Sequence, residues 1–170
     1  MTATLVADPL PHPRQKESLA SSAPEKSGRA RVSVAEQRAF SVLDALTEQA
    51  QINRRTLLEK RALISSGDLQ RALGITRQAI SAAVRTGRLF SVDVDGANWY
   101  PAFFADGKVD RSVLAAVTQQ LAQLPGWSKW DFFTAARASL GGKTPLEALR
   151  AGRVDEVMRV AKAVVEEARQ

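Results

Sequence analysis

The stretch from residue 65 to residue 87, SSGDLQRALGITRQAISAAVRTG, decides how the middle of the chain folds. Ser65 or Ser66 can cap a short helix over Asp68 to Leu73, because a serine hydroxyl accepts hydrogen bonds from the free N–H groups of a first helical turn. Gly74 then supplies the left-handed backbone conformation that a tight turn between two helices requires. The first part of the stretch therefore predicts a capped helix that stops at a glycine.

A second short helix is predicted after this glycine, capped by Thr76 and ended by Gly87. The apolar residues of the stretch recur at the spacing at which two short helices pack across each other at a steep angle. They are Leu69, Leu73, Ile75, Ile80 and Val84. The sequence therefore predicts a helix-turn-helix centred on Gly74, and the alternative is an ordinary corner of two helices with a solvated outer face.

The polar residues of the second helix favour the first of these interpretations. Burial of the apolar positions leaves four polar side chains on its outer side, Arg77, Gln78, Ser81 and Arg85. In the major groove, arginine pairs with guanine through two hydrogen bonds, and glutamine pairs in the same way with adenine. Flanking arginines suit backbone phosphates. The residues expected to contact double-stranded DNA are therefore Arg71, Thr76, Arg77, Gln78, Ser81, Arg85 and Arg88.

A β-hairpin is predicted directly after the two helices. Residues 88–95 contain a β-prone run, and the pair Asp95-Gly96 is a strong signal for a two-residue turn. Residues 98–104 are the expected return strand, in which Pro101 is tolerated only at an edge or at a strand end. This order of elements resembles that of winged-helix and excisionase-like DNA-binding proteins.

The hairpin region contains acidic residues, which make the hairpin unsuited to binding DNA phosphates. They are Asp93, Asp95 and Asp106. We therefore expect the hairpin to brace the two helices more than to contact DNA. Its aromatic residues are expected mainly in the core, and they are Trp99, Tyr100, Phe103 and Phe104.

Missing residue types exclude several kinds of chemistry. The chain of 170 residues has no cysteine, and its one histidine, His12, lies between two prolines. A catalytic triad needs a positioned base, and a structural zinc site needs about four Cys, His or carboxylate ligands. We therefore expect a protein without enzymatic activity, without a cofactor and without a metal site.

Charge and hydropathy indicate the kind of partner. The formal net charge is +6, and residues 34–90 carry nine Lys or Arg against five Asp or Glu. Clustered cations favour binding to a polyanion such as DNA, because binding releases the condensed counterions of the polyanion. A mildly basic soluble protein that binds no polyanion would have the same charge. The sequence contains no run of about 18–20 apolar residues and no secretory signal, so we expect a cytoplasmic protein without a membrane span.

The first 62 residues divide into two parts. Residues 1–32 hold four of the seven prolines and are expected to be a disordered basic arm. This arm either keeps the protein soluble or contacts DNA phosphates through its basic residues. Residues 33–62 contain neither Gly nor Pro and are expected to form a long helix capped by Ser33. This helix predicts either a dimer seam with a buried asparagine or a helix packed on its own domain. Its stripe contains Ala39, Leu43, Leu46, Ala50, Asn53 and Leu57.

The rest of the chain is predicted to be helical. The two helices and the hairpin fall within residues 63–109, and residues 110–126 are expected to form a connecting amphipathic helix. Residues 127–170 are expected to form three further helices, separated by Gly141–Gly142 and by Gly152. The expected inner face of the last helix consists of Val154, Val157, Val160, Ala161 and Val164.

The turn before the middle of these three helices carries a specific pattern. Thr144 is placed as a cap, with Pro145 at the first helical position and Glu147 at the capping-box spacing. The residues LGGKTPLEAL at 140–149, preceded by an aromatic helix, are similar to the toxin-binding domain of the Xre/MbcA/ParS-like antitoxins over residues 127–170. The alternative is that this turn is only a well-capped connection.

In that family the domain follows a DNA-binding helix-turn-helix and contacts a toxin of the RES type, and the complex represses its own operon. The resemblance therefore implies a protein toxin as partner. It also implies a partner-facing region shaped by Leu140, Gly141, Gly142, Thr144, Pro145, Leu146 and Leu149.

Together these features predict a mainly α protein, in which a helix-turn-helix with a short β-hairpin wing precedes a small C-terminal three-helix module. The expected function is that of a homodimeric, sequence-specific DNA-binding protein that regulates transcription. One alternative is an antitoxin-like protein that binds a RES-type toxin and autoregulates its operon. A second alternative is a plasmid or phage maintenance factor that binds DNA with little sequence preference.

Overall fold

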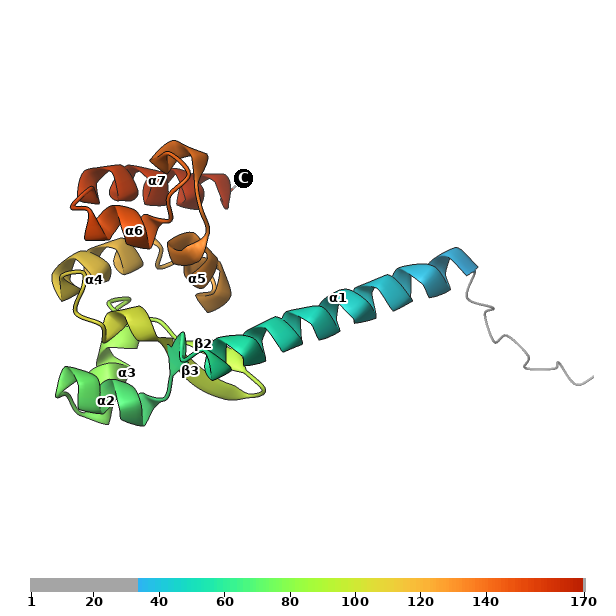
Figure 1. The fold of residues 1–170 in the computed structure, drawn as a ribbon, viewed down its shortest axis with the longest axis horizontal. Helices are drawn as coiled ribbons and strands as arrows, with labels where there is room; N and C mark the ends of the chain where they lie inside the picture. The colour runs from blue at the N-terminus through green and yellow to red at the C-terminus, as the bar shows by residue number, and fades with distance from the viewer. Residues whose placement is uncertain (1–33, 170) are drawn as a thin grey trace, which may run out of the picture.

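The computed structural model of the chain describes residues 34–169. These residues form a mainly helical structure with a small three-stranded antiparallel sheet (Figure 1). The mainly α class expected from the sequence is therefore confirmed. The expected arm of residues 1–32 and the cap expected at Ser33 lie outside the described residues.

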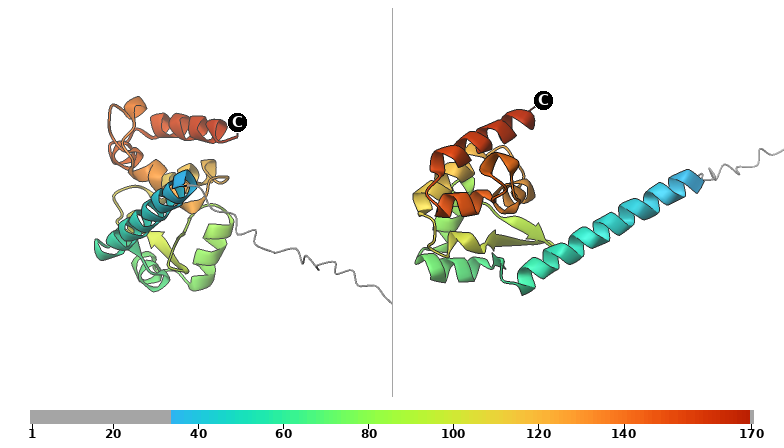
Figure 2. Two further views of the ribbon diagram at one scale, coloured as in Figure 1. Left: turned by 90° about the vertical axis from the view of Figure 1, so that its right-hand side faces the viewer. Right: turned by 45° about the horizontal axis from the view of Figure 1, so that its top comes forward.

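The longest helix, α1 (Val34–Glu59), protrudes from the rest of the described chain for most of its length (Figures 1 and 2). The side chains of Leu43 and Leu46 are 59% and 62% exposed. Only the last turns reach the body of the protein, where Leu57 and Leu58 pack against the core. The long helix is thus confirmed, whereas the interpretation that it packs along its own domain is wrong for its exposed N-terminal part. None of the helices within residues 34–169, α1 included, has the length of apolar sequence needed to cross a bilayer.

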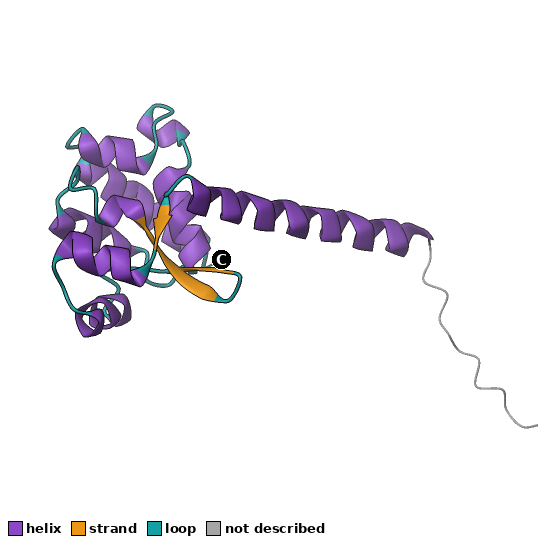
Figure 3. Ribbon diagram, turned by 60° about the horizontal axis from the view of Figure 1, so that its bottom comes forward, coloured by secondary structure: helices purple, strands orange, loops and turns teal. Residues whose placement is uncertain are grey.

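Three short strands form the sheet at the base of α1, which is shown in orange in Figure 3. They are β1 (Leu63–Ile64), β2 (Val92–Val94) and β3 (Ala97–Pro101), in the order β1-β3-β2. The predicted hairpin is β2–β3, and Asp95 and Gly96 both have positive φ angles, 53° and 80°, as a two-residue type I′ turn requires. Strand β1 was not predicted.

Strand β3 is shorter than expected. Pro101 is its last residue, in agreement with the expectation for a proline, and it lies opposite Leu63 of β1. Residues Ala102–Phe104, expected to extend the strand, form the 3-10 turn η1 instead. This turn buries both phenylalanines, which a straight strand would have placed on opposite faces.

A cluster of aromatic rings joins the sheet to the helices above it. The ring of Phe103 lies 4.8 Å from that of Phe104 and 5.0 Å from that of Phe133, measured between centroids. Phe103 and Phe104 are buried as expected, whereas Trp99 and Tyr100 are half-buried and pack against the core. The cluster forms part of the core shared by the sheet and by the helix α5 (Gly126–Thr134).

Helix α5 begins against the sheet at a glycine. A Cβ atom on Gly126 would lie 2.1 Å from the carbonyl oxygen of Ser91, a distance that no side chain tolerates. Helix α4 (Arg111–Gln120), capped by Asp110, lies beside α5 and corresponds to the predicted connecting helix. In Figure 1, these two helices separate α2 (Ser66–Leu73) and α3 (Arg77–Arg85) at one end of the body from the last two helices at the other.

The last two helices are α6 (Pro145–Arg150) and α7 (Val154–Glu167). Helix α6 starts with the predicted capping box, in which Glu147 N–H donates to Thr144 Oγ1 at 3.1 Å and Thr144 N–H donates to Glu147 Oε2 at 2.8 Å. Of the expected inner face of α7, Val157 and Ala161 are buried. The other members are half-buried, namely Val154, Val160 and Val164.

One expectation about this region is wrong. Gly141 and Gly142 do not end the aromatic helix, because α5 stops at Thr134 and the chain then runs through the 3-10 turn η2 (Ala138–Leu140). Arg137 N–H donates to the carbonyl of Lys143 at 3.0 Å, which closes the segment into a small loop. This loop buries Leu140, and that tertiary contact outweighs the helical propensity of the alanines after Thr134.

Candidate nucleic-acid interface

The first helix of the candidate interface, α2, is fixed at both ends by its own sequence. Ser65 Oγ accepts a hydrogen bond from Asp68 N–H at 3.1 Å and donates one to Asp68 Oδ2 at 2.7 Å. At the other end, Gly74 has φ 65° and ψ 32°, and its N–H donates to the carbonyl of Gln70 at 2.9 Å. The left-handed geometry is strained for any residue with a Cβ atom, so the predicted role of Gly74 as the turn residue is confirmed.

The second helix, α3, starts two residues after this glycine. Thr76 Oγ1 accepts a hydrogen bond from Ala79 N–H at 3.2 Å, which confirms the predicted cap. The turn between the helices therefore consists of Gly74, Ile75 and Thr76 alone. Such a short connection leaves little freedom in the angle between the two helices.

Apolar side chains under the two helices hold them on the body. Leu69 of α2 and Ile80 of α3 are 0% and 1% exposed. The other three predicted packing residues are half-buried against the same core, and they are Leu73, Ile75 and Val84. All five therefore lie on the inner side, which fixes the side of α3 that faces solvent.

The outer face of α3, as we call Arg77, Gln78, Ser81 and Arg85, is exposed along the whole helix. Together with Ala82 these four side chains line one shallow surface hollow. The helix contains two arginines and neither Asp nor Glu. The structure thus gathers these four expected contact residues on one cationic, hydrogen-bonding surface.

The flanking residues predicted to contact DNA have partners within the protein. Arg71 forms an ion pair with Asp68 one turn earlier on α2, and its side chain is 78% exposed. The hydrogen bonds from Ser65, followed by the charge of Arg71, lower the pKa of Asp68, so this carboxylate stays ionised. Arg88 Nε donates to Thr86 Oγ1 at 3.0 Å, just beyond the end of α3. Both arginines remain exposed enough to reach an anion.

A cation that the sequence did not indicate lies near α3, beside a hollow that is separate from the outer face. A surface hollow of about 520 Å³ beside α3 is lined by Arg88 and, from the first turn of α4, by Arg111. Arg111 lies 23 positions after Arg88 in the chain, and no local pattern connects the two. The floor of the hollow is mostly apolar and includes Leu73, Ile75, Ala79, Ala83, Leu89, Phe104 and Ala115.

The acidic residues of the hairpin contact protein groups. Asp95 accepts from Arg55 Nε of α1 at 2.9 Å, and the side chain of Asp93 accepts from Gly96 N–H at 3.2 Å within the turn. Trp127 Nε1 of α5 donates to the backbone carbonyl of Asp93 at 3.1 Å. The tip of the hairpin therefore touches α1 and α5.

The residues assigned to a partner-facing region fall into two groups. Leu140, Pro145 and Leu149 are buried and contribute to the core, so they can only shape the turn around them. Gly141 and Gly142 are exposed. Thr144 and Leu146 are half-buried. The seven residues therefore do not form one continuous outer surface.

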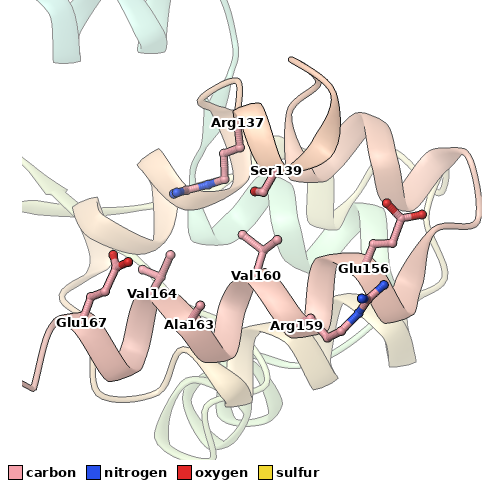
Figure 4. A pocket seen from close by; sticks show the side chains of 8 residues that line it. All are labelled: Arg137, Ser139, Glu156, Arg159, Val160, Ala163, Val164 and Glu167. Carbon is pink, nitrogen blue, oxygen red and sulfur yellow. The ribbon is translucent and has the colours of Figure 1, made fainter.

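A groove of about 540 Å³ lies next to this turn, between Arg137 and Ser139 on one side and α7 on the other (Figure 4). Val160 and Val164 of α7 point toward it in Figure 4. The guanidinium of Arg137 lies 4.8 Å from the centre of the Phe132 ring, and its Nε atom is buried without a hydrogen-bond partner among the described residues. The rim carries charges of both signs, from Arg159, Glu156 and Glu167.

Residues 34–169 contain no group of three or more His, Cys, Asp or Glu side chains that is arranged to hold a metal ion. Comparisons with known protein families, with curated proteins and with solved structures find no match to this chain.

Proposed function

We propose that the protein binds double-stranded DNA in a sequence-specific manner and regulates transcription. In this proposal α2 and α3 form a helix-turn-helix, α3 enters the major groove, and the β2–β3 hairpin acts as a wing that braces the motif. The observation that carries the proposal is the outer face of α3, where two arginines, a glutamine and a serine lie on a rigidly held helix without a carboxylate.

The chemistry of this face fits base edges. Arg77 and Gln78 lie in the first turn of α3, and in helix-turn-helix proteins the N-terminal residues of the second helix contact the bases. Arginine recognises guanine and glutamine recognises adenine, each through paired hydrogen bonds. The buried contacts of Leu69 and Ile80 would keep the helix in a fixed orientation while it binds.

The surrounding cations fit the DNA backbone. Arg71 lies in the last turn of α2, Arg88 just beyond the end of α3, and Arg111 in the first turn of α4, where it lines a hollow with Arg88. Phosphate contacts of this kind position a protein on the duplex but do not specify a sequence. The protein would therefore combine a small base-reading surface with a wider electrostatic one.

The test is to select bound sequences from a random duplex library and then to measure affinity for the best site. We expect Arg77→Ala to weaken binding to that site by about 1–3 kcal/mol and to relax the preference at one base pair. Arg159→Ala on α7 removes the same charge at the other end of the body and is the matched control, expected to bind as the parent does.

Two outcomes would contradict this proposal. Equal losses for both variants would indicate that net charge alone matters. Steep salt dependence without selection of any sequence would favour the alternative of an architectural maintenance factor.

We infer a second candidate function from the groove between Arg137 and α7: an antitoxin-like protein that binds a protein toxin. The groove combines three apolar residues of α7, Val160, Ala163 and Val164, with Arg137, whose buried Nε has no hydrogen-bond partner among residues 34–169, and it lies within the region that resembles the toxin-binding domain. In this candidate function a segment of the toxin would occupy the groove and accept a hydrogen bond from Arg137.

Co-expression with a RES-type toxin, followed by growth measurements, tests this candidate. We expect Ala163→Arg, which fills the groove from an exposed position, to abolish protection while DNA binding persists. Ala151→Arg, an equal change at an exposed position outside the groove, should protect as the parent does. Full protection by Ala163→Arg would exclude the groove as the binding site.

A further inference from the structure

The protruding part of α1 carries an apolar face that nothing in the described chain covers. Leu43 and Leu46 are 59% and 62% exposed. The face follows alternating steps of three and four residues, the spacing of a seam between two paired helices. Its members are Ala39, Leu43, Leu46, Ala50, Asn53 and Leu57.

The same face is covered at its C-terminal end by the body of the protein. Leu57 packs against the core, and Ala50 is half-buried. Arg54 lies over the ring of Trp127, 4.8 Å from its centre. The body therefore lies on the apolar side of α1 and stops near Ala50, and the remaining N-terminal turns extend past it (Figure 2).

We propose that this face binds the same face of a second copy of the chain, with the two α1 helices antiparallel and the two-fold axis between Leu43 and Leu46. Leu43 then packs on Leu46 of the partner subunit, and Ala39 lies against Ala50 of the partner subunit. The large side chains meet at the centre of the seam and the small ones at its ends, so the face is complementary to itself.

The position of the body selects the antiparallel orientation. In a parallel pair, both bodies would lie at the same end of the seam and on the side that faces the partner helix, so they would compete for one space. In the antiparallel pair, the two bodies lie at opposite ends of the seam, each beside the first turn of the partner's α1. The exposed apolar turns of both helices are then covered at the same time.

The charge of α1 and the residues after it favours the same orientation. Residues 34–48 carry three carboxylates against one arginine, whereas residues 49–61 carry four cations against one carboxylate. A parallel pair would place acidic half along acidic half and basic half along basic half. Antiparallel pairing avoids this: it places Arg54 and Arg55 along residues 35 and 34 of the partner subunit, and it aligns the two helix dipoles favourably. A helix from an unrelated protein would need to match both the apolar spacing and this charge gradient.

Disulfide crosslinking tests the orientation, because the chain has no natural cysteine. In the antiparallel pair the two copies of residue 39 lie about 16 Å apart along the seam, beyond the reach of a disulfide. We expect Ala39→Cys and Ala50→Cys each to remain uncrosslinked under mild oxidation, and the double variant to form a disulfide-linked dimer. Crosslinking of the single variants would indicate a parallel pair and overturn the proposal.

Sedimentation equilibrium without DNA tests the seam itself. The parent is expected to have the mass of two chains, and Leu46→Glu the mass of one. Ser41→Glu introduces the same charge on the opposite, exposed side of α1 and should remain dimeric. A monomeric parent, or a dimeric Leu46→Glu, would overturn the proposal. Arg77→Ala should stay dimeric, so failure of this inference and failure of the proposed DNA binding are separate outcomes.

Discussion

The two ends of the body both contain a helix that is capped by a threonine, but they expose different charged residues. At one end Thr76 caps α3, and at the other Thr144 caps α6, each through a threonine hydroxyl that accepts a backbone N–H. The exposed surfaces differ. Helix α3 has no carboxylate, whereas α7, which follows α6, has four carboxylates among its charged residues. The first surface suits a polyanion and the second suits a protein partner of mixed charge, so function depends on the residues outside the caps.

The largest effect is expected from the core under α2. Leu69→Ala removes a fully buried side chain and should lower the free energy of unfolding by about 2–5 kcal/mol. Because one core connects both ends, chemical denaturation should show a single transition, monitored by the fluorescence of Trp99, Trp127 and Trp130, which lie in or against that core. Ile52→Ala, at an exposed position on the side of α1 away from the proposed seam, is the control and should change the stability little. Two separate transitions would indicate that the ends fold independently.

Removal of each threonine cap compares the two ends of the body in both stability and DNA binding. Thr76→Ala and Thr144→Ala should each lower the free energy of unfolding by about 1 kcal/mol, because each leaves a first-turn N–H without its acceptor. The loss should be larger for Thr144, whose capping box also includes Glu147. Only Thr76→Ala is expected to weaken DNA binding as well, which a filter-binding measurement on the folded variants would detect. Equal losses of DNA affinity would contradict the assignment of function to the α3 end.

Charge on the two ends should affect salt dependence differently. Arg88→Gln removes a proposed phosphate contact, so the slope of log affinity against log salt should become shallower by about one, uniformly across sequences. Arg159→Gln on α7 should leave the slope unchanged. A reduced slope for both variants would indicate that DNA contacts the whole body.

The smallest expected effect concerns pH. Hydrogen bonds from the backbone and side chain of Thr144 lower the pKa of Glu147 below its ordinary value of 4.5. The stability that the ionised carboxylate contributes is therefore complete above pH 4.5 and is lost as the pH falls through the lowered pKa. Glu147→Gln should be less stable than the parent at pH 6, and the difference should shrink at lower pH. A constant difference in melting temperature would argue against this contribution.

Much of the α3 end could be predicted from sequence because its determinants are local. A cap, a turn glycine and the spacing of the apolar residues lie within the 23 residues from Ser65 to Gly87, and each acts on its immediate neighbours. The structure accordingly has α2 and α3 close to the expected bounds, with Ser65, Gly74 and Thr76 in the expected roles. The type I′ turn at Asp95-Gly96 is local in the same sense.

The features that escaped prediction depend on contacts between distant residues. Strand β1 contains only two residues and exists because β3, more than 30 residues later, pairs with it. Arg111 joins the surface beside α3 through the packing of α4. The early end of α5 reflects the pairing of Arg137 with Lys143 and the burial of Leu140. Alanine-rich sequence before Leu140 gave no sign of this break.

The length of α1 has a consequence for the DNA that the proposed pair would recognise. With the two-fold axis between Leu43 and Leu46, the two copies of Glu59 lie about 44 Å apart at 1.5 Å per residue. This exceeds the roughly 34 Å of one turn of the double helix, which separates the half-sites of many dimeric regulators. The operator would then consist of two short, inverted blocks more than one turn apart, and affinity would depend on the number of base pairs inserted between them.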